Sequence, residues 1–135
     1  MNKLTIIRGL PGSGKSTYAA RNYPDTFHVE TDMFHIHDGE YDFNPDVRSQ
    51  SESWLKNSIR IALRSGMDVV ASCVFGHAKK IEELKQIAND AGAKFEVIRL
   101  IGNFGDKHNV PKDVLGAMRE SFEEWSGEIV INQKG

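Results

Sequence analysis

The amino-acid sequence predicts an α/β fold, built on a mainly parallel sheet of about five strands with helices on both faces. Short apolar runs, each typical of a buried strand, alternate with longer segments in which apolar residues recur at helical spacing. Strands that alternate with helices favour a parallel sheet joined by right-handed crossovers. The chain has 135 residues, of which 39% are hydrophobic and 27% are charged, so residues 1–135 are predicted to form a single domain.

The glycine-rich stretch at residues 9–17 (Gly-Leu-Pro-Gly-Ser-Gly-Lys-Ser-Thr) fits the phosphate-loop pattern G-x-x-x-x-G-K-[ST]. It follows an apolar run that is typical of a buried strand, and it leads into a segment without helix breakers. The alternative is a glycine-rich turn that matches by chance, but such a turn would lack this order of strand, loop and helix. The stretch therefore predicts a P-loop NTPase fold.

The chemistry expected of this loop is the binding of ATP with Mg²⁺. Glycines adopt backbone angles that other residues avoid, so the loop can turn its N–H groups toward a phosphate chain. The following helix directs its positive end at the same anion. Lys15 is expected to neutralise the terminal phosphates, and the Ser16 hydroxyl is expected to ligate Mg²⁺. The predicted ATP-binding residues are Gly9, Gly12, Ser13, Gly14, Lys15, Ser16 and Thr17.

The first half of the chain is predicted to contain two strands and two helices. Leu4, Ile6 and Ile7 form too continuous an apolar run for a half-exposed strand, which predicts a central strand of the sheet. Pro24 ends the first helix, and Gly66 ends the second. In order, the expected elements are a strand at 3–8, a helix at 15–22, a strand at 27–30, a polar connection at 33–45 and a helix at 46–65.

The second half repeats the alternation with a shorter final unit. Ile81, Leu84 and Ala88 recur at helical spacing before a glycine, and a later apolar stripe runs from Leu115 to Trp125. In order, the expected elements are a strand at 67–75, a helix that ends at 92, a strand at 93–101, a loop at 102–110, a helix at 111–125 and a strand at 128–132. A disordered tail is the alternative for this last segment.

Asp32 follows the second predicted strand and is the main candidate for a catalytic carboxylate. Ligands of open α/β sheets bind outside the carboxyl ends of the strands, which predicts that Asp32 lies near the phosphate loop. A carboxylate there can accept the proton of an attacking hydroxyl, or it can ligate Mg²⁺ through water. An N-cap for a short turn is the alternative. The predicted catalytic residues are Asp32 and Lys15, and the predicted metal-binding residues are Ser16 and Asp32.

Other groups of a phosphotransfer site are harder to find in the sequence. The third predicted strand ends without the carboxylate that would orient Mg²⁺, although Ser72 offers a hydroxyl there. Arg48 and Arg119 either clamp a phosphoryl group or lie on solvated helix surfaces. His35 and His37 are only weak evidence for a metal site, because two histidines in a loop have no cysteine partner.

Four stretches of the chain together resemble the P-loop polynucleotide 5′-hydroxyl kinases. The likeness is closest to the kinase domain of the phage end-healing enzyme and to related small ATP-binding proteins of phages and bacteria. The stretches are the phosphate loop, residues 31–34 (Thr-Asp-Met-Phe), residues 39–43 (Gly-Glu-Tyr-Asp-Phe) and residues 108–115 with Met118.

The resemblance implies a kinase core in which the loop before the last helix acts as a lid over ATP. It also implies that Asp32 is the general base for a 5′-hydroxyl, and that Lys15 and Ser16 hold the triphosphate and Mg²⁺. The chain departs from the family pattern in three places. The predicted lid has no arginine, His35 stands where an arginine is expected, and residues 73–75 replace an Asp-x-Asn type motif.

The sequence therefore predicts an ATP-dependent kinase that transfers the γ-phosphoryl group to a hydroxyl, with a polynucleotide 5′-OH as the first candidate acceptor. The alternatives are a regulatory module that binds ATP and hydrolyses it weakly, and a small-metabolite kinase. The net charge of −2 gives no overall basic field for nucleic acid. The single cysteine, Cys73, and the lack of a signal peptide or a membrane span favour a cytoplasmic protein.

Overall fold

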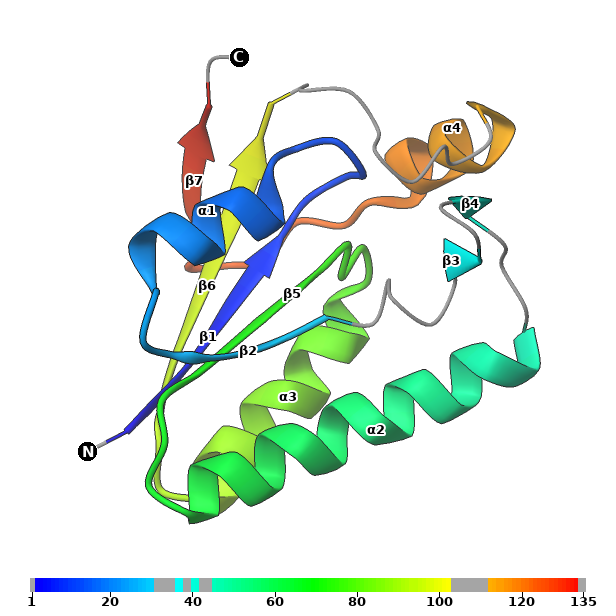
Figure 1. The fold of residues 1–135 in the computed structure, drawn as a ribbon. Coiled ribbons are helices and arrows are strands. Elements are labelled where there is room, and N and C mark those ends of the chain that lie inside the picture. The colour runs from blue at the N-terminus through cyan, green and yellow to red at the C-terminus, as the bar shows by residue number, and fades with distance from the viewer. Residues whose placement is uncertain (1, 31–35, 38–39, 42–44, 103–111, 134–135) are drawn as a thin grey trace.

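Within the residues that the structure describes, five strands form one parallel sheet in the order β2-β5-β1-β6-β7 (Figure 1). The structure is a computed structural model, and it describes residues 2–30, 36–37, 40–41, 45–102 and 112–133. In sheet order, the strands are β2 (Phe27–Val29), β5 (Val69–Cys73), β1 (Lys3–Arg8), β6 (Lys94–Ile101) and β7 (Ile129–Asn132). The predicted fold class is confirmed.

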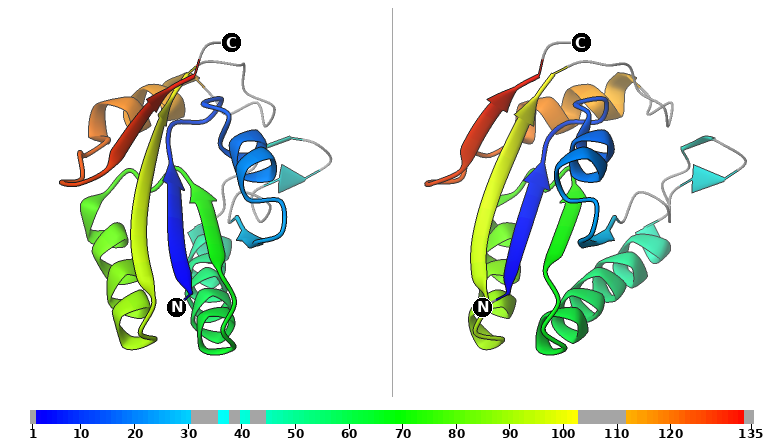
Figure 2. Two further views of the ribbon diagram at one scale, coloured as in Figure 1. Left: turned by 90° about the vertical axis from the view of Figure 1, so that its left-hand side faces the viewer. Right: turned by 60° about the vertical axis from the view of Figure 1, so that its left-hand side comes forward.

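Helices cover both faces of this sheet, as the sequence predicts (Figure 2). Helix α1 (Lys15–Asn22) packs on one face, and α2 (Pro45–Arg64) and α3 (Ala78–Asp90) pack on the other. Helix α4 (Lys112–Ser121) lies beyond the carboxyl ends of the strands, and none of its side chains is buried (Figure 1). Among the described helices, none is long and apolar enough to span a bilayer.

Two apolar cores lie on opposite faces of the sheet, and β1 contributes side chains to both. The larger core joins Leu4 and Ile6 of β1 to apolar side chains of α2 and α3, such as Ile59 and Ile81. The smaller core packs Ile7 against α1. Successive side chains of a strand point to opposite faces, so a strand buried on both faces is apolar at nearly every position. This explains why β1 was recognisable as a central strand from its sequence.

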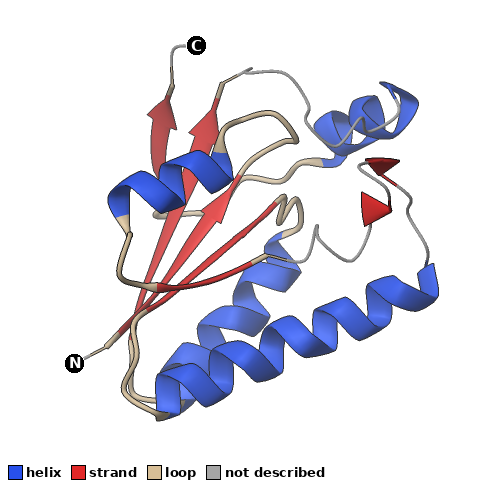
Figure 3. Ribbon diagram, in the orientation of Figure 1, coloured by secondary structure: helices blue, strands red, loops and turns tan. Residues whose placement is uncertain are grey.

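The connection at 33–45 contains an antiparallel hairpin that the sequence analysis did not predict. Its strands are β3 (Ile36–His37) and β4 (Glu40–Tyr41), shown as two short arrows in Figure 3. The dipeptide between them in the sequence, Asp38-Gly39, is one that hairpin turns favour. Two residues on each side are too few to show the alternation by which strands are recognised in a sequence.

The prediction that the last helix continues to Trp125 is wrong, since α4 ends at Ser121. The apolar stripe has helical spacing, but tertiary contacts take over after Ser121. The Glu123 N–H donates to the Gly76 carbonyl at 2.7 Å, and Trp125 packs against the larger core. These contacts draw residues 122–125 across the sheet and out of the helix.

The remaining boundaries differ from the prediction by one or two residues. Strand β5 is shorter than 67–75 because the Met67 N–H closes the end of α2 and Phe75 has a φ of 46°, which bends the chain out of the strand. The final segment forms β7 rather than a disordered tail, and it pairs in parallel with β6. Cys73 is buried in β5, as expected of a small apolar side chain.

Candidate functional site

The phosphate loop joins β1 to α1 at the carboxyl end of the sheet (Figure 1). Gly12 and Gly14 have φ angles of 84° and 88°, which residues with a Cβ rarely adopt. Gly14 is also the N-cap of α1, and it has no side chain that could accept the first N–H groups of the helix. The sequence therefore builds a loop with its backbone N–H groups and the positive end of α1 at one place.

Gly9 is required by close packing rather than by its backbone angles. A Cβ at this position would lie 2.5 Å from Ser13 Oγ and 2.8 Å from the Leu100 carbonyl oxygen. Ser13, another predicted binding residue, is 1% exposed, and its hydroxyl lies next to Gly9. Gln133, which follows β7, donates from Nε2 to the Ser13 carbonyl at 2.8 Å and ties the last strand to the loop.

Lys15 lies folded into the loop that precedes it. Its Nζ donates to the carbonyl oxygens of Gly9 at 3.0 Å and Leu10 at 3.1 Å, and the residue is 8% exposed. The ammonium group is therefore held at the loop itself and not out in solvent. Thr17, the last residue of the motif, is exposed on α1.

Ser16 contacts a carboxylate that the sequence analysis did not single out. Its hydroxyl donates to Glu30 Oε1 at 2.7 Å. The same carboxylate lies 3.1 Å from His28 Nε2, and this nitrogen also contacts the buried hydroxyl of Ser72. The loop serine, the end of β2 and the end of β5 thus form one chain of polar contacts. The signal in the sequence was an acid at the end of the strand predicted at 27–30, two positions before Asp32.

The oxygen atoms at this place suit Mg²⁺, which prefers hydroxyl, carboxylate and phosphate oxygens. Within the described part of the chain, no three His, Cys, Asp or Glu side chains converge as a metal cage would require. Mg²⁺ in nucleotide sites is usually held by one or two protein groups together with phosphates and water. Ser16, with Glu30 behind it, fits that pattern.

Several predicted site residues lie outside the described residues. They are Asp32, His35 and the predicted lid, apart from Gly102. The side chain of Arg48 is likewise not described. Arg119 is exposed on α4, which leaves both of its predicted roles open.

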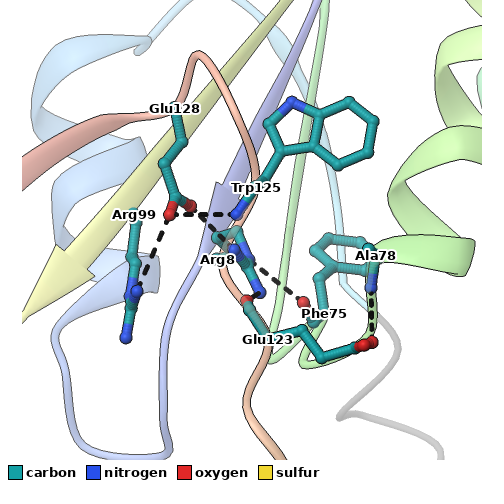
Figure 4. Close-up of polar contacts among 7 residues, drawn as sticks. All are labelled: Arg8, Phe75, Ala78, Arg99, Glu123, Trp125 and Glu128. Atoms are coloured by element: carbon teal, nitrogen blue, oxygen red, sulfur yellow. Dashed lines mark hydrogen bonds and ion pairs between the residues drawn. The ribbon is translucent and has the colours of Figure 1, made fainter.

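A second polar cluster lies directly before the loop, around Arg8 (Figure 4). Arg8 is fully buried, and its Nη1 donates to Glu128 Oε1 at 2.7 Å. Nε donates to the Phe75 carbonyl at 3.1 Å, and Nη2 donates to the Glu123 carbonyl. The guanidinium also lies 4.2 Å from the centre of the Phe122 ring. Burial lowers the pKa of Arg8, while the hydrogen bond and charge of Glu128 act in the opposite direction, and the side chain stays charged at neutral pH.

This cluster joins three segments that are far apart in the sequence. Arg8 ends β1, Phe75 follows β5, and the segment from Phe122 to Glu128 links α4 to β7. Glu123 adds a further contact, because its Oε1 accepts from the Ala78 N–H at the start of α3 (Figure 4). The cluster fixes the base of the loop and the segment after α4 relative to each other.

The strand order and the glycine loop after the central strand define this chain as an α/β protein with the P-loop NTPase fold. Residues 4–101 match the family model AAA_33, described as AAA domain, and the chain belongs to this family. A relative with 33% identity over 134 residues is an uncharacterized protein of Pasteurella multocida (strain Pm70). The match covers 87% of this chain and 75% of that relative.

Solved structures with the same fold include several kinases. A sugar kinase from Janibacter sp. HTCC2649 has a TM-score of 0.67 and 16% identity, over 99% of this chain and 86% of that one. The APS kinase CysC of Mycobacterium tuberculosis, in complex with AMPPNP and APS, has a TM-score of 0.66 and 16% identity, over 97% and 88%. The Pnkp1/Rnl/Hen1 RNA repair complex has a TM-score of 0.61 and 20% identity, over 88% of this chain and 37% of that one. At these identities the likeness concerns the fold.

Proposed function

We propose that this protein is an ATP-dependent phosphotransferase that moves the γ-phosphoryl group of ATP to a hydroxyl, with the 5′-OH of a polynucleotide as the acceptor. The observation that carries the proposal is the arrangement of the loop. The Lys15 ammonium lies against the loop carbonyls, and the Ser16 hydroxyl lies against Glu30 at the carboxyl end of the sheet. This is the donor half of a phosphotransfer site.

Each group of the loop has a part in the proposed reaction. Backbone N–H groups of residues 12–17 bind the phosphate chain, and Lys15 exchanges its carbonyl partners for phosphate oxygens, which are charged and therefore stronger acceptors. Ser16 is the side chain that would hold Mg²⁺, which neutralises charge on the β- and γ-phosphates when it is bound. Asp32 takes the proton from the attacking hydroxyl, as the resemblance to polynucleotide kinases implies.

Different observations support three candidate functions: two kinases that differ in their acceptor, and a regulatory module. The likeness to the polynucleotide kinases in four stretches of sequence, and the shared fold with an RNA repair complex, support a 5′-hydroxyl end. The shared fold with a sugar kinase and an APS kinase supports a small-metabolite kinase as the second candidate. The absence of arginine from the sequence of 102–110 supports a third, an ATP-binding regulatory module with weak hydrolysis.

Labelled ATP offered with a 5′-hydroxyl oligonucleotide tests the proposal. We expect label on the oligonucleotide, and none on the same oligonucleotide that already carries a 5′-phosphate. Asp32→Asn should slow transfer by roughly 10²- to 10⁴-fold and leave ATP affinity unchanged, because a general base contributes to the transition state and not to nucleotide binding. Asp25→Asn, a matched change before β2, should transfer normally.

The outcomes separate the three candidates. Tight ATP binding without transfer to the oligonucleotide overturns the polynucleotide version. Mass spectrometry of a panel of hydroxyl-bearing metabolites incubated with ATP then detects a small-metabolite kinase. ATP binding without any phosphorylated product across both sets of acceptors favours the regulatory module.

A further inference from the structure

The carboxylate of Glu30 occupies a position in the sheet that explains its contact with the loop. Val29 lies opposite Ala71 in the register of β2 and β5, and Ile7 lies opposite Ser72 in the register of β1 and β5. One step further along β2, Glu30 reaches the level of Ser72. The loop starts two residues after Ile7, so the end of β2 and the start of α1 come together over the end of β5.

In a phosphotransfer site, the end of β5, next to β1, is the expected position of an acid that orients Mg²⁺. In this chain Ser72 occupies that position instead. Ser72 is 2% exposed, and its hydroxyl contacts His28 on β2. His28 in turn contacts Glu30, whose side chain is 23% exposed. The buried serine on β5 therefore contacts the histidine that in turn contacts the carboxylate of Glu30, which follows the neighbouring strand β2.

We propose that Glu30 is the residue that orients Mg²⁺ at the loop, acting through the Ser16 hydroxyl, and that His28 and Ser72 hold Glu30 in place. The proposal rests on the proposed binding of Mg²⁺-ATP, and it does not depend on the acceptor. It moves the orienting acid from β5, beside the central strand, to β2 at the edge of the sheet.

The physical reason lies in the hydrogen bond itself. Ser16 Oγ has one proton and two lone pairs. Because the proton is donated to Glu30 Oε1 at 2.7 Å, the lone pairs point elsewhere and are available to a metal. Acceptance by a carboxylate also increases the negative charge on Oγ, which makes it a better ligand. Outer-shell partners of this kind typically change metal affinity by roughly 10- to 100-fold when they are removed.

The test measures Mn²⁺ binding, as a spectroscopic substitute for Mg²⁺, to the full chain saturated with a nonhydrolysable ATP analogue. Electron paramagnetic resonance reports free Mn²⁺ and needs no turnover. We expect Glu30→Gln and Glu30→Ala to weaken Mn²⁺ binding by roughly 10- to 100-fold, with analogue affinity in EDTA unchanged. Asp25→Asn is the control for the loss of one negative charge, since Asp25 is exposed before the other end of β2.

A double-variant comparison separates action through Ser16 from a general effect of charge. In a Ser16→Ala background, Glu30→Ala should change Mn²⁺ affinity less than twofold, because the hydroxyl through which it acts is gone. Full additivity of the two changes overturns the proposal, as does a Glu30→Ala variant that binds Mn²⁺ like the wild type.

Circular dichroism and thermal melting show that each variant is folded. If Glu30→Ala does not fold, Glu30→Gln decides alone, because its side chain has the same shape. Loss of phosphotransfer to every acceptor with Glu30-dependent Mn²⁺ binding retained would refute the proposed function and leave this inference standing.

Discussion

The buried pair of Arg8 and Glu128 should be a major contributor to the stability of the fold. Arg8→Met leaves three oxygen acceptors without their donor, namely those of Phe75, Glu123 and Glu128. At about 1 kcal/mol for each lost hydrogen bond, together with about 0.5 kcal/mol for the contact with the Phe122 ring, the expected loss is about 3 to 4 kcal/mol. A buried charge left without any partner typically costs about 3–5 kcal/mol, and because Arg99 stays 3.6 Å from Glu128 Oε2, the loss should lie near the lower end of that range.

Urea unfolding followed by circular dichroism measures the effect. With a denaturant slope of about 2 kcal/mol per M, a loss of about 3 kcal/mol lowers the midpoint by about 1.5 M. Glu128→Gln should also destabilise strongly, because Arg8 would remain fully buried without its counter-charge. The double variant Arg8→Met/Glu128→Gln should be more stable than the sum of the single losses predicts, by about 2 kcal/mol.

The matched control is a more exposed ion pair that also involves a residue of β1. Lys3 of β1 lies 2.6 Å from Glu96 of β6, and their side chains are 39% and 28% exposed. Exposed pairs typically contribute about 0.2–1 kcal/mol, so Lys3→Met should shift the midpoint only slightly. Equal shifts for Arg8→Met and Lys3→Met, or strict additivity in the double variant, would refute the reasoning that burial gives the Arg8 pair its weight.

Two further predictions concern single contacts. Gly9→Ala should destabilise the protein by about 1–3 kcal/mol and weaken ATP binding, because its Cβ would meet backbone and Ser13 atoms at 2.5–2.8 Å; thermal melting with and without ATP measures both effects. Gly116→Ala in α4, where a Cβ meets nothing within 4 Å, is the control and should stabilise slightly. The hydrogen bond from Lys56 lowers the pKa of Glu83 below 4.5, so the pair stabilises the fold above that pH and the contribution is lost as the pH falls through the lowered pKa. Glu83→Gln should therefore cost about 0.5 kcal/mol at pH 7 and nearly nothing at pH 2, as measured by urea unfolding at both values.

The parts of the fold that the sequence predicted correctly are those with local signals. Strand β1 has an unbroken apolar run, the loop has its glycines and Lys15, and α2 and α3 have apolar positions at helical spacing before a glycine. Each of these features is contained within about 20 residues. The β3-β4 hairpin was missed because its strands are too short to show an alternating pattern, and other failures occurred where the deciding contact lies far along the chain. The end of α4 is one, because the contact between Glu123 and Gly76 spans 47 residues.

The site shows the same division. The position of Lys15 follows from the motif, whereas the contact between Ser16 and Glu30 depends on the register of β2 against β5, which no local pattern specifies. Arg8 could have been found by alternation. It shares a face of β1 with Leu4 and Ile6, and both of these belong to the larger core. A charged residue on a fully buried face indicates a buried partner, but the sequence does not identify Glu128 as that partner, because the two residues are 120 positions apart.

Two polar clusters contact the loop or its base from opposite faces of the sheet. One is centred on Arg8 and Glu128, and the other links Ser16 to Glu30, His28 and Ser72. Arg8 points to the face covered by α2 and α3, together with Leu4 and Ile6, whereas Ser72 points to the face of α1, as its neighbour Ile7 does. They share no residue, so their free-energy contributions should be nearly additive. Arg8→Met should then lower the free energy of unfolding without changing Mn²⁺ affinity at the loop. Glu30→Gln should weaken Mn²⁺ binding and leave the free energy of unfolding nearly unchanged. A change in Mn²⁺ affinity in Arg8→Met under conditions where the variant is fully folded would show that the base of the loop, and not only Glu30, orients Ser16.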